Sequence, residues 1–239
     1  MAVSFNSDTH TYTHNEHGKL ISVTTLLGKY KKPFDSNFHA TRVAKKEGVS
    51  IEMVLEMWEA EKNRACDRGT RIHELLENYI TVGDVEQDYS WLYKSYDKSV
   101  ERYIDNFKEI HCEKLLHNDD YKVAGTADLI YDHPNNEFTV GDFKTNKKFR
   151  FSSPFSERLL APVDHLHSCE FSNYSLQLSL YAYLYEELTG KKCRKLVIFY
   201  LDGDRFRAYH CSYLKNDVKN ILKHFNKGIN TVNESNKTS

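Results

Sequence analysis

Hydrophobic and polar positions divide the first half of the chain into one strand-forming stretch and several helical ones. Residues 3–21 alternate in polarity, and His17-Gly18 is typical of a turn, so we predict a β-hairpin there. Ser22 is expected to cap a short helix that ends near Lys29. Three later stretches have hydrophobic residues at the three- and four-residue spacing of helices: about 36–66, 68–80 and 89–109.

Beyond residue 110 the pattern changes to strands, a helix and a hairpin. Three strands are predicted, at 111–117, 121–132 and 137–145, and Pro134–Asn136 would form the turn between the last two. Residues 146–171 have no clear period, and we expect a long loop with one helical turn at most. The last predicted elements are a helix over 173–189 that ends at Gly190, strands over 196–202 and 205–211 joined at Gly203-Asp204, and a helix over 213–227.

This order of elements predicts a mixed α/β fold with one central sheet and helices on its faces. We expect a single domain over residues 1–229. Within it, residues 1–65 would form an N-terminal hairpin and helical elaboration, and residues 66–229 would form the core. The polar tail over 230–239 is expected to be flexible.

Composition excludes few classes of protein. Hydrophobic residues make up 40% and charged residues 28%, as in soluble globular proteins. No window approaches the ~20 apolar residues of a membrane span, and we find no secretory signal. The five irregularly spaced cysteines give no support to a zinc finger and suit a reducing cytoplasm. The net charge of −1 leaves nucleic-acid binding open, because acidic and basic clusters can cancel in the sum.

A candidate catalytic unit lies in the predicted strand that contains Gly141-Asp142-Phe143-Lys144. Asp142 and Lys144 are two residues apart and therefore point to the same face of the strand, with Phe143 on the other. Asp128 comes fourteen residues earlier, and pairing of the two strands would bring it beside Asp142. Two adjacent carboxylates repel each other unless a cation or a proton lies between them. A hard cation bound through oxygen is the chemistry that this pattern favours.

The predicted helices supply further candidates. His73 is a plausible metal ligand. Gln177 and Tyr181 are four residues apart and share one helix face, from which they can contact the sheet. Gly125, three residues before Asp128, leaves room for a close approach of backbone or ligand.

The set His73, Gly125-x-x-Asp128, Asp142-x-Lys144 and Gln177-x-x-x-Tyr181 resembles, in its order and context, the RecB-type branch of the PD-(D/E)XK nucleases. The resemblance covers roughly residues 66–211. The stretches ISVTTLLGKYKKPFD and APVDHLHSCEFSNYSLQLSLYAYL are similar to phage-encoded exonucleases of that branch and to the mitochondrial genome-maintenance exonuclease. The resemblance implies a restriction-endonuclease-like core and metal-assisted hydrolysis of phosphodiester bonds.

The resemblance also implies a role for each residue. Asp128 and Asp142 would bind Mg²⁺ or Mn²⁺, helped by His73 and by the carbonyl group of Phe143, and Lys144 would be the catalytic lysine. Gln177 and Tyr181 would support the site. Many members have an acidic residue on the preceding strand, for which Glu113 is the candidate.

The resemblance further implies a DNA exonuclease that acts on single strands or free ends, in phage-type recombination, repair or degradation. Some relatives hold an iron–sulfur cluster through one early cysteine and three clustered late ones; here Cys66, Cys193 and Cys211 are isolated, so we expect no cluster. No Walker A motif is found. A helicase or recombination protein would therefore be a separate partner, and we expect no membrane association.

Basic and aromatic residues alternate after the catalytic unit, which suits a groove that follows a single strand. The candidate nucleic-acid-binding residues are Lys147, Lys148, Phe149, Arg150 and Tyr174. A solvated loop with phenylalanines facing the core explains the same pattern equally well. We also expect the 146–171 loop and the helical 36–66 region to frame a channel for one strand.

Each signal has an ordinary structural explanation when taken alone. An Asp-x-Lys pair can be a solvated ion pair, His73 a surface residue, and the Gln177–Tyr181 face simple packing. Their conjunction favours a nuclease. Two alternatives stay open: a non-catalytic nucleic-acid-binding module on the same fold, and an endonuclease that depends on a partner. The module is less favoured, because every proposed catalytic position keeps a competent side chain.

Overall fold

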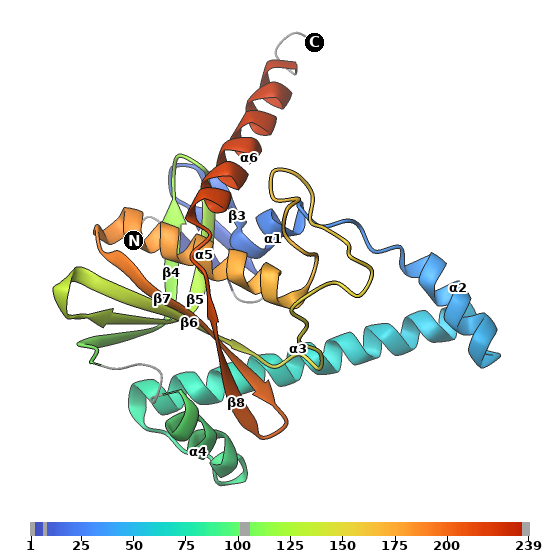
Figure 1. Ribbon diagram of the computed structural model, residues 1–239, viewed down its shortest axis with the longest axis horizontal. Helices are drawn as coiled ribbons and strands as arrows, with labels where there is room; N and C mark the ends of the chain where they lie inside the picture. The colour runs from blue at the N-terminus through green and yellow to red at the C-terminus, as the bar shows by residue number, and fades with distance from the viewer. Residues whose placement is uncertain (1–2, 7–8, 101–105, 236–239) are drawn as a thin grey trace.

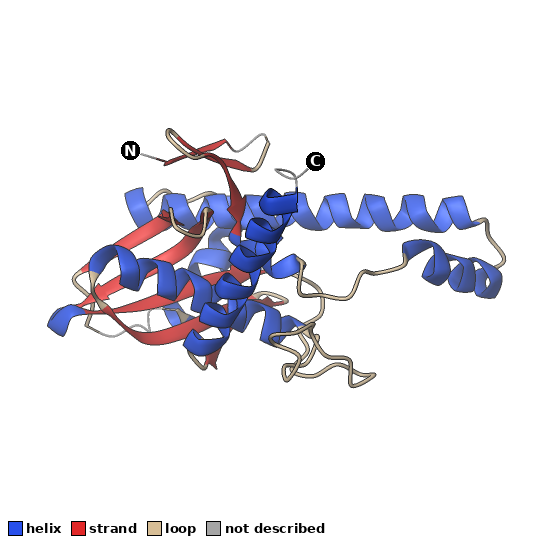
Figure 2. Cartoon of the chain, turned by 90° about the horizontal axis from the view of Figure 1, so that it is seen from above, coloured by secondary structure: helices blue, strands red, loops and turns tan. Residues whose placement is uncertain are grey.

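The computed structural model describes residues 3–6, 9–100 and 106–235, with side chains as far as residue 227. It is a mixed α/β structure in which helices flank a central mixed sheet (Figures 1 and 2). The helices are α1 (Val23–Gly28), α2 (Ser36–Glu47), α3 (Ile51–Val82), α4 (Ser90–Ser99), α5 (Glu170–Thr189) and α6 (Lys215–Ser235), with 3₁₀ turns at Gln87–Tyr89 and Pro134–Asn136. None of these helices is long and apolar enough to cross a membrane.

The sheet has the strand order β1-β2-β3-β5-β6-β7-β8, with β4 on the other edge of β5. The pairs β4–β5, β5–β6 and β7–β8 are antiparallel, whereas β3–β5 and β6–β7 are parallel. Because β6 and β7 are parallel, the chain must cross the sheet between them, and α5 makes this crossing. The strands are β1 (Val3–Asn6), β2 (Thr11–His14), β3 (Gly18–Ser22), β4 (Glu109–Asn118), β5 (Val123–His133), β6 (Glu137–Lys144), β7 (Lys192–Asp202) and β8 (Arg205–Cys211).

The central strands are buried on both faces. In β7, Leu196 and Ile198 pack on the side of α1, α5 and α6, and Val197 and Phe199 pack on the side of α3 and α4. This double burial explains the continuous hydrophobic run of β7. In β6 the same alternation directs Val140, Asp142 and Lys144 toward α5 and Phe143 toward α3.

Helix α3 differs from the sequence prediction. We predicted a break near residue 67, between helices over 36–66 and 68–80. Instead one helix of 32 residues is continuous from Ile51 to Val82, and the break comes earlier, at 48–50. Gly48 ends α2 in the left-handed conformation and the Ser50 hydroxyl caps α3. Gly69 lies inside the helix, where an added Cβ would lie 3.3 Å from the Thr145 hydroxyl.

Other boundaries need smaller corrections. The N-terminal hairpin is a three-stranded antiparallel unit, and its third strand, β3, joins the central sheet. The helix predicted over 89–109 ends at Ser99, and β4 already begins at Glu109; residues 101–105 lie outside the described part. Residues 146–169 contain turns and one bridge, Arg158–His167, but no helical turn. The last helix was predicted over 213–227, and the backbone of α6 is helical from Lys215 to Ser235; residues 236–239 are not described.

We predict that Gly125→Ala destabilises the protein. A Cβ at this position in β5 would lie 2.8 Å from Tyr181 Cε1 and 2.8 Å from Val23 Cγ2, so α1 and α5 would have to shift. Overpacking of this kind costs about 1–3 kcal/mol. Denaturant unfolding should show the loss. The matched control is Gly28→Ala, where nothing lies within 4 Å of the new atom; an equal loss in the control would contradict the steric explanation.

Candidate active site

The site lies where β5 and β6 separate. Their last ladder pair is Leu129–Gly141, and Asp128 and Asp142 come next in the same register. The Phe143 N–H therefore has no ladder partner on β5 and donates to Asp128 Oδ2 over 2.8 Å. The N–H and C=O groups of one strand residue point to the same edge. The Phe143 carbonyl is thus on the Asp128 side as well.

Asp142 is a nearly inaccessible carboxylate with 1% of its surface exposed. The Lys144 ammonium contacts its Oδ2, and the Gln177 amide donates to its Oδ1 over 3.5 Å. Burial raises the pKa of Asp142 to about 6, although Lys144 opposes the shift. Oδ2 receives no hydrogen bond of good geometry despite its contact with Lys144. A buried acceptor of this kind suits a cation.

Lys144 lies between Asp142 and the ring of Tyr174, with Nζ 4.8 Å from the ring centroid. Burial lowers its pKa, but the charges of Asp142 and Asp128 outweigh burial, and the net shift is upward. The ammonium is therefore kept charged. Tyr174 is fixed in turn, because its hydroxyl donates to Asn146 Oδ1 over 3.0 Å.

Gln177 and Tyr181 lie beneath Asp142 on α5. The Gln177 amide nitrogen, besides its contact with Asp142, donates to the Tyr181 oxygen over 3.2 Å. Tyr181 is 4% exposed, and burial raises its pKa well above the usual value, which keeps the phenol neutral. The two side chains hold the position of Asp142 from below.

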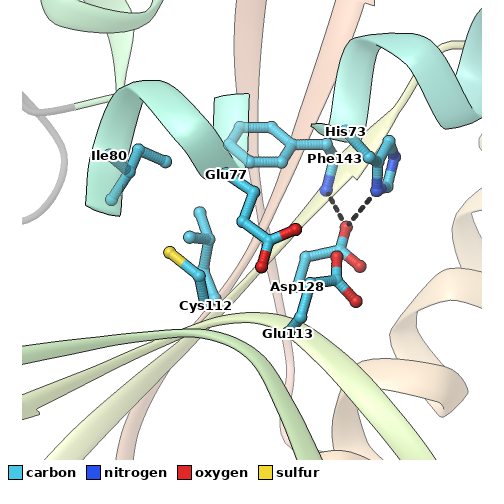
Figure 3. A pocket seen from close by; sticks show the side chains of 8 residues that line it. His73, Glu77, Ile80, Cys112, Glu113, Asp128 and Phe143 are labelled. Carbon is cyan, nitrogen blue, oxygen red and sulfur yellow. Dashed lines mark hydrogen bonds and ion pairs between the residues drawn. The ribbon is translucent and has the colours of Figure 1, made fainter. Parts of the chain in front are cut away.

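His73 and Glu113 lie beside Asp128 (Figure 3). His73 Nδ1 on α3 lies 3.5 Å from Asp128 Oδ2. Glu113 is opposite Asp128 in the register of β4 and β5, but its φ of 45° interrupts the ladder there. One ligand atom from each of the three residues lies within 4.8 Å of the others. They can share one cation.

Glu77 belongs to the same group of side chains, and we did not predict it from the sequence. It lies one helical turn after His73 on α3, and its carboxylate points toward Asp128 and Glu113 (Figure 3). Glu113 keeps an exposed surface, yet protein atoms crowd its carboxyl group. This burial, followed by the charges of Asp128 and Glu77, raises the pKa of Glu113 to about 8. The spacing His73-x-x-x-Glu77 was the available signal.

The donor set fits a hard divalent cation. It consists of carboxylate oxygens and one imidazole nitrogen, which Mg²⁺ and Mn²⁺ accept as ligands. Neighbouring carboxylates help to raise the pKa of Glu113 and of Asp142, so negative charge is in excess at this point. A bound cation would relieve that repulsion.

Another group with metal-ligand chemistry, Glu109, His111 and Asp132, is occupied differently. Asp132 accepts from His111 over 3.0 Å and from the Tyr185 hydroxyl, and the Lys191 ammonium contacts the same carboxylate. These contacts lower the pKa of Asp132 despite its burial. This group is an ion-pair network that fixes the start of β7 to the end of β5.

The residues predicted to bind nucleic acid do not share one surface. Phe149 is half-buried and stacks on Tyr209 with centroids 4.8 Å apart, so it faces the core. Arg150 makes a two-point ion pair with Glu170, at 2.9 and 2.7 Å. Lys147 contacts Glu61 of α3, and Lys148 is exposed. Tyr174 contacts Lys144 inside the site.

Comparisons with known proteins identify no family. No family model matches the chain, and no curated protein matches it. One similar solved structure is that of SSO0001, with 16% identity over 87% of this chain and 75% of that protein and a TM-score of 0.41. Another is a candidate exonuclease from Eubacterium rectale, with 10% identity over 86% and 69% of the two chains and a TM-score of 0.36. These scores are too low for either likeness to bear on function.

We predict that the metal-free protein becomes less stable as the pH rises from about 4.5 to about 8. Over this range the folded protein keeps a proton on Glu113 that the unfolded chain has lost, because the pKa is raised from 4.5 to about 8. The free energy of unfolding must therefore fall with rising pH. Urea unfolding in EDTA at several pH values measures this slope.

Glu113→Gln should flatten the slope, whereas Glu109→Gln, at an exposed position of the same strand, should leave it unchanged. Added Mn²⁺ should stabilise the wild type at high pH by binding the ionised carboxylates. A slope that is identical in the wild type and in Glu113→Gln would refute this account of the crowded carboxyl.

Proposed function

We propose that the protein is a metal-dependent nuclease that hydrolyses phosphodiester bonds in DNA, with the restriction-endonuclease-like core of the PD-(D/E)XK superfamily. The observation that supports this proposal is the geometry at the end of the β5–β6 ladder. Two carboxylates, Asp128 and Asp142, lie next to each other there. The charged ammonium of Lys144 pairs with the buried Asp142 and not with an acidic residue on the surface. Such a unit can hold a cation and a phosphate together.

Hydrolysis joins a water oxygen to phosphorus and breaks one P–O bond, which leaves a phosphate monoester and a hydroxyl group. A divalent cation, when bound, supplies Lewis-acid stabilisation of the phosphate charge. Asp128, Asp142, His73 and the Phe143 carbonyl would hold it, with Glu113 or Glu77 completing the set. Lys144, held by Asp142 and Tyr174, would orient the attacking water and neutralise charge on the phosphate.

The substrate we propose is DNA with single-stranded character or free ends, cut in an exonuclease mode. The site is bordered by α3 and by the loop after β6, which approach each other where Lys147 contacts Glu61. Together they would confine one strand rather than a duplex. This part of the proposal rests on the sequence resemblance in addition to the site.

Lys144→Ala should abolish cleavage of end-labelled single-stranded DNA in Mg²⁺ or Mn²⁺, by a factor of at least about a hundred, because the group that neutralises phosphate charge is lost. The control is Lys192→Ala, an exposed lysine at the opposite end of the β6–β7 ladder. The control should cleave at the wild-type rate. EDTA should stop cleavage by the wild type and by Lys192→Ala.

Further substrates separate the alternatives. Resistance of circular single-stranded DNA supports the exonuclease mode, and its cleavage would point to an endonuclease. No cleavage in any metal, with DNA binding retained, would favour a non-catalytic binding module. Activity that is undiminished in Lys144→Ala would overturn the proposed site.

A further inference from the structure

The hairpin of α2 and α3 projects from the body of the protein, with α2 joined to α1 by an extended segment (Figure 1). A small internal core of Ala40, Ala44 and Val54 holds the two helices together. The segment over 29–47, which leads into α2 and includes it, carries six lysines and arginines and two acidic residues, Asp35 and Glu47. Glu47 pairs with Lys46 at 3.2 Å on the exposed surface. All six basic residues are exposed. This strongly positive strip contrasts with the net charge of −1 of the whole chain.

Asp35 does not offset this strip at a distance, because its carboxylate caps α2 by accepting from the Phe38 N–H over 2.9 Å. The acidic residues of α3 are also directed elsewhere. Glu59 pairs with Lys62 at 3.2 Å. At about 100° per residue, Glu56 lies about 160° and Glu52 about 120° around α3 from Trp58. Glu61 lies on the Trp58 side, but its carboxylate pairs with Arg64 and Lys147.

Aromatic rings open to solvent lie along the positive strip. Phe34 is 66% exposed, and its ring stacks on His39 with centroids 4.6 Å apart and planes at 5°. Trp58 of α3 is 36% exposed and lies 6.2 Å from Phe34. The three rings, with Arg42, Val43 and Lys46, line a hollow between the two helices, which we call the hairpin groove. Large exposed rings are costly in a surface that contacts only water.

We propose that the hairpin groove binds a segment of single-stranded nucleic acid, with a base stacked on the Phe34, His39 and Trp58 rings and phosphates paired with Arg42 and Lys46. Flat rings offer a face to any base, and adjacent cations follow the backbone, so such a site is tolerant of sequence. This inference rests on the proposed nuclease function for its biological sense, but binding in the groove is independent of cleavage.

The groove is distant from the candidate active site but rigidly connected to it. Trp58 and His73 lie on the same uninterrupted helix, fifteen residues apart, which corresponds to about 22 Å. A strand stacked at roughly 3.4 Å per nucleotide would need about six or seven nucleotides to span this length. Substrates longer than this would gain affinity from the groove, whereas substrates of two or three nucleotides would not.

A protein partner or a second copy of the chain is the rival occupant of an exposed apolar hollow. The charge around the groove argues against a second copy, because two strips of net positive charge would face each other. A polyanion with flat bases matches both the charge and the rings.

Trp58 fluorescence provides a direct test, because the chain has only two tryptophans and Trp91→Phe would remove the other. In EDTA, where cleavage is stopped, a fifteen-nucleotide oligo(dT) should quench Trp58. In anisotropy measurements, Phe34→Ala and Trp58→Ala should each weaken binding about tenfold to a hundredfold through lost stacking. Arg42→Ala should also weaken binding and reduce its dependence on salt.

The matched controls are Met57→Ala, an exposed apolar residue beside Trp58 that does not line the groove, and Arg205→Ala at the exposed start of β8. Both should bind as the wild type does. Trinucleotide cleavage should be equal in the wild type and Trp58→Ala, whereas cleavage of the fifteen-nucleotide substrate at low concentration should fall in the variant.

The outcomes distinguish this proposal from the proposed function. If binding depends on Trp58 and Arg42 but the protein has no nuclease activity, the result supports nucleic-acid binding in the hairpin groove and contradicts only the proposed nuclease function. Wild-type binding in all three groove variants, or the absence of any oligo(dT) binding, overturns the groove. A shift from dimer to monomer in Trp58→Ala, with DNA binding intact, would overturn it too and assign the hollow to a second copy.

Discussion

The electrostatic problem posed by Asp142 governs this site. Its carboxylate is removed almost entirely from water. A second carboxylate, that of Asp128, lies opposite it on the neighbouring strand, where β5 and β6 separate. Such an arrangement is unstable unless positive charge or donated hydrogen bonds compensate. Lys144 and Gln177 provide part of this compensation within the protein, and the Phe143 N–H does the same for Asp128. The remaining negative charge faces His73, at the place where a cation fits.

The fold serves this arrangement by bringing helices to both faces of one strand. Helix α5 crosses under β6 and presents Gln177 and Tyr181 to Asp142, and Gly125 in β5 permits the close approach of Tyr181. On the opposite face α3 presents His73. The parallel pairing of β6 and β7 requires the crossing helix, so the topology of the sheet and the support of the carboxylate have the same origin.

The sequence was sufficient for the parts of the structure that depend on local pattern. The strands predicted at 111–117, 121–132 and 137–145 and the hairpin predicted over 196–211 all form, although β4 begins at Glu109 and β7 at Lys192. Register arithmetic alone brings Asp128 beside Asp142. The continuity of α3 was not predictable from Gly69, because tertiary packing overrides a weak local preference. Nor were the partners of Lys147 and Arg150, which come from Glu61 and Glu170, distant in sequence. Glu77 was missed because its place in the site depends on which face of α3 packs against the sheet.

The left-handed backbone of Glu113 lowers the stability of the fold at a position whose carboxylate adds negative charge beside Asp128. A non-glycine residue held at a φ of 45° in the middle of a strand costs on the order of 1 kcal/mol or more. Glycine would relieve that strain at once, but it would bring no carboxylate to Asp128. Replacing Glu113 by glycine would therefore exchange negative charge beside Asp128 for a more relaxed strand, so folding and cation binding make opposite demands on this one position.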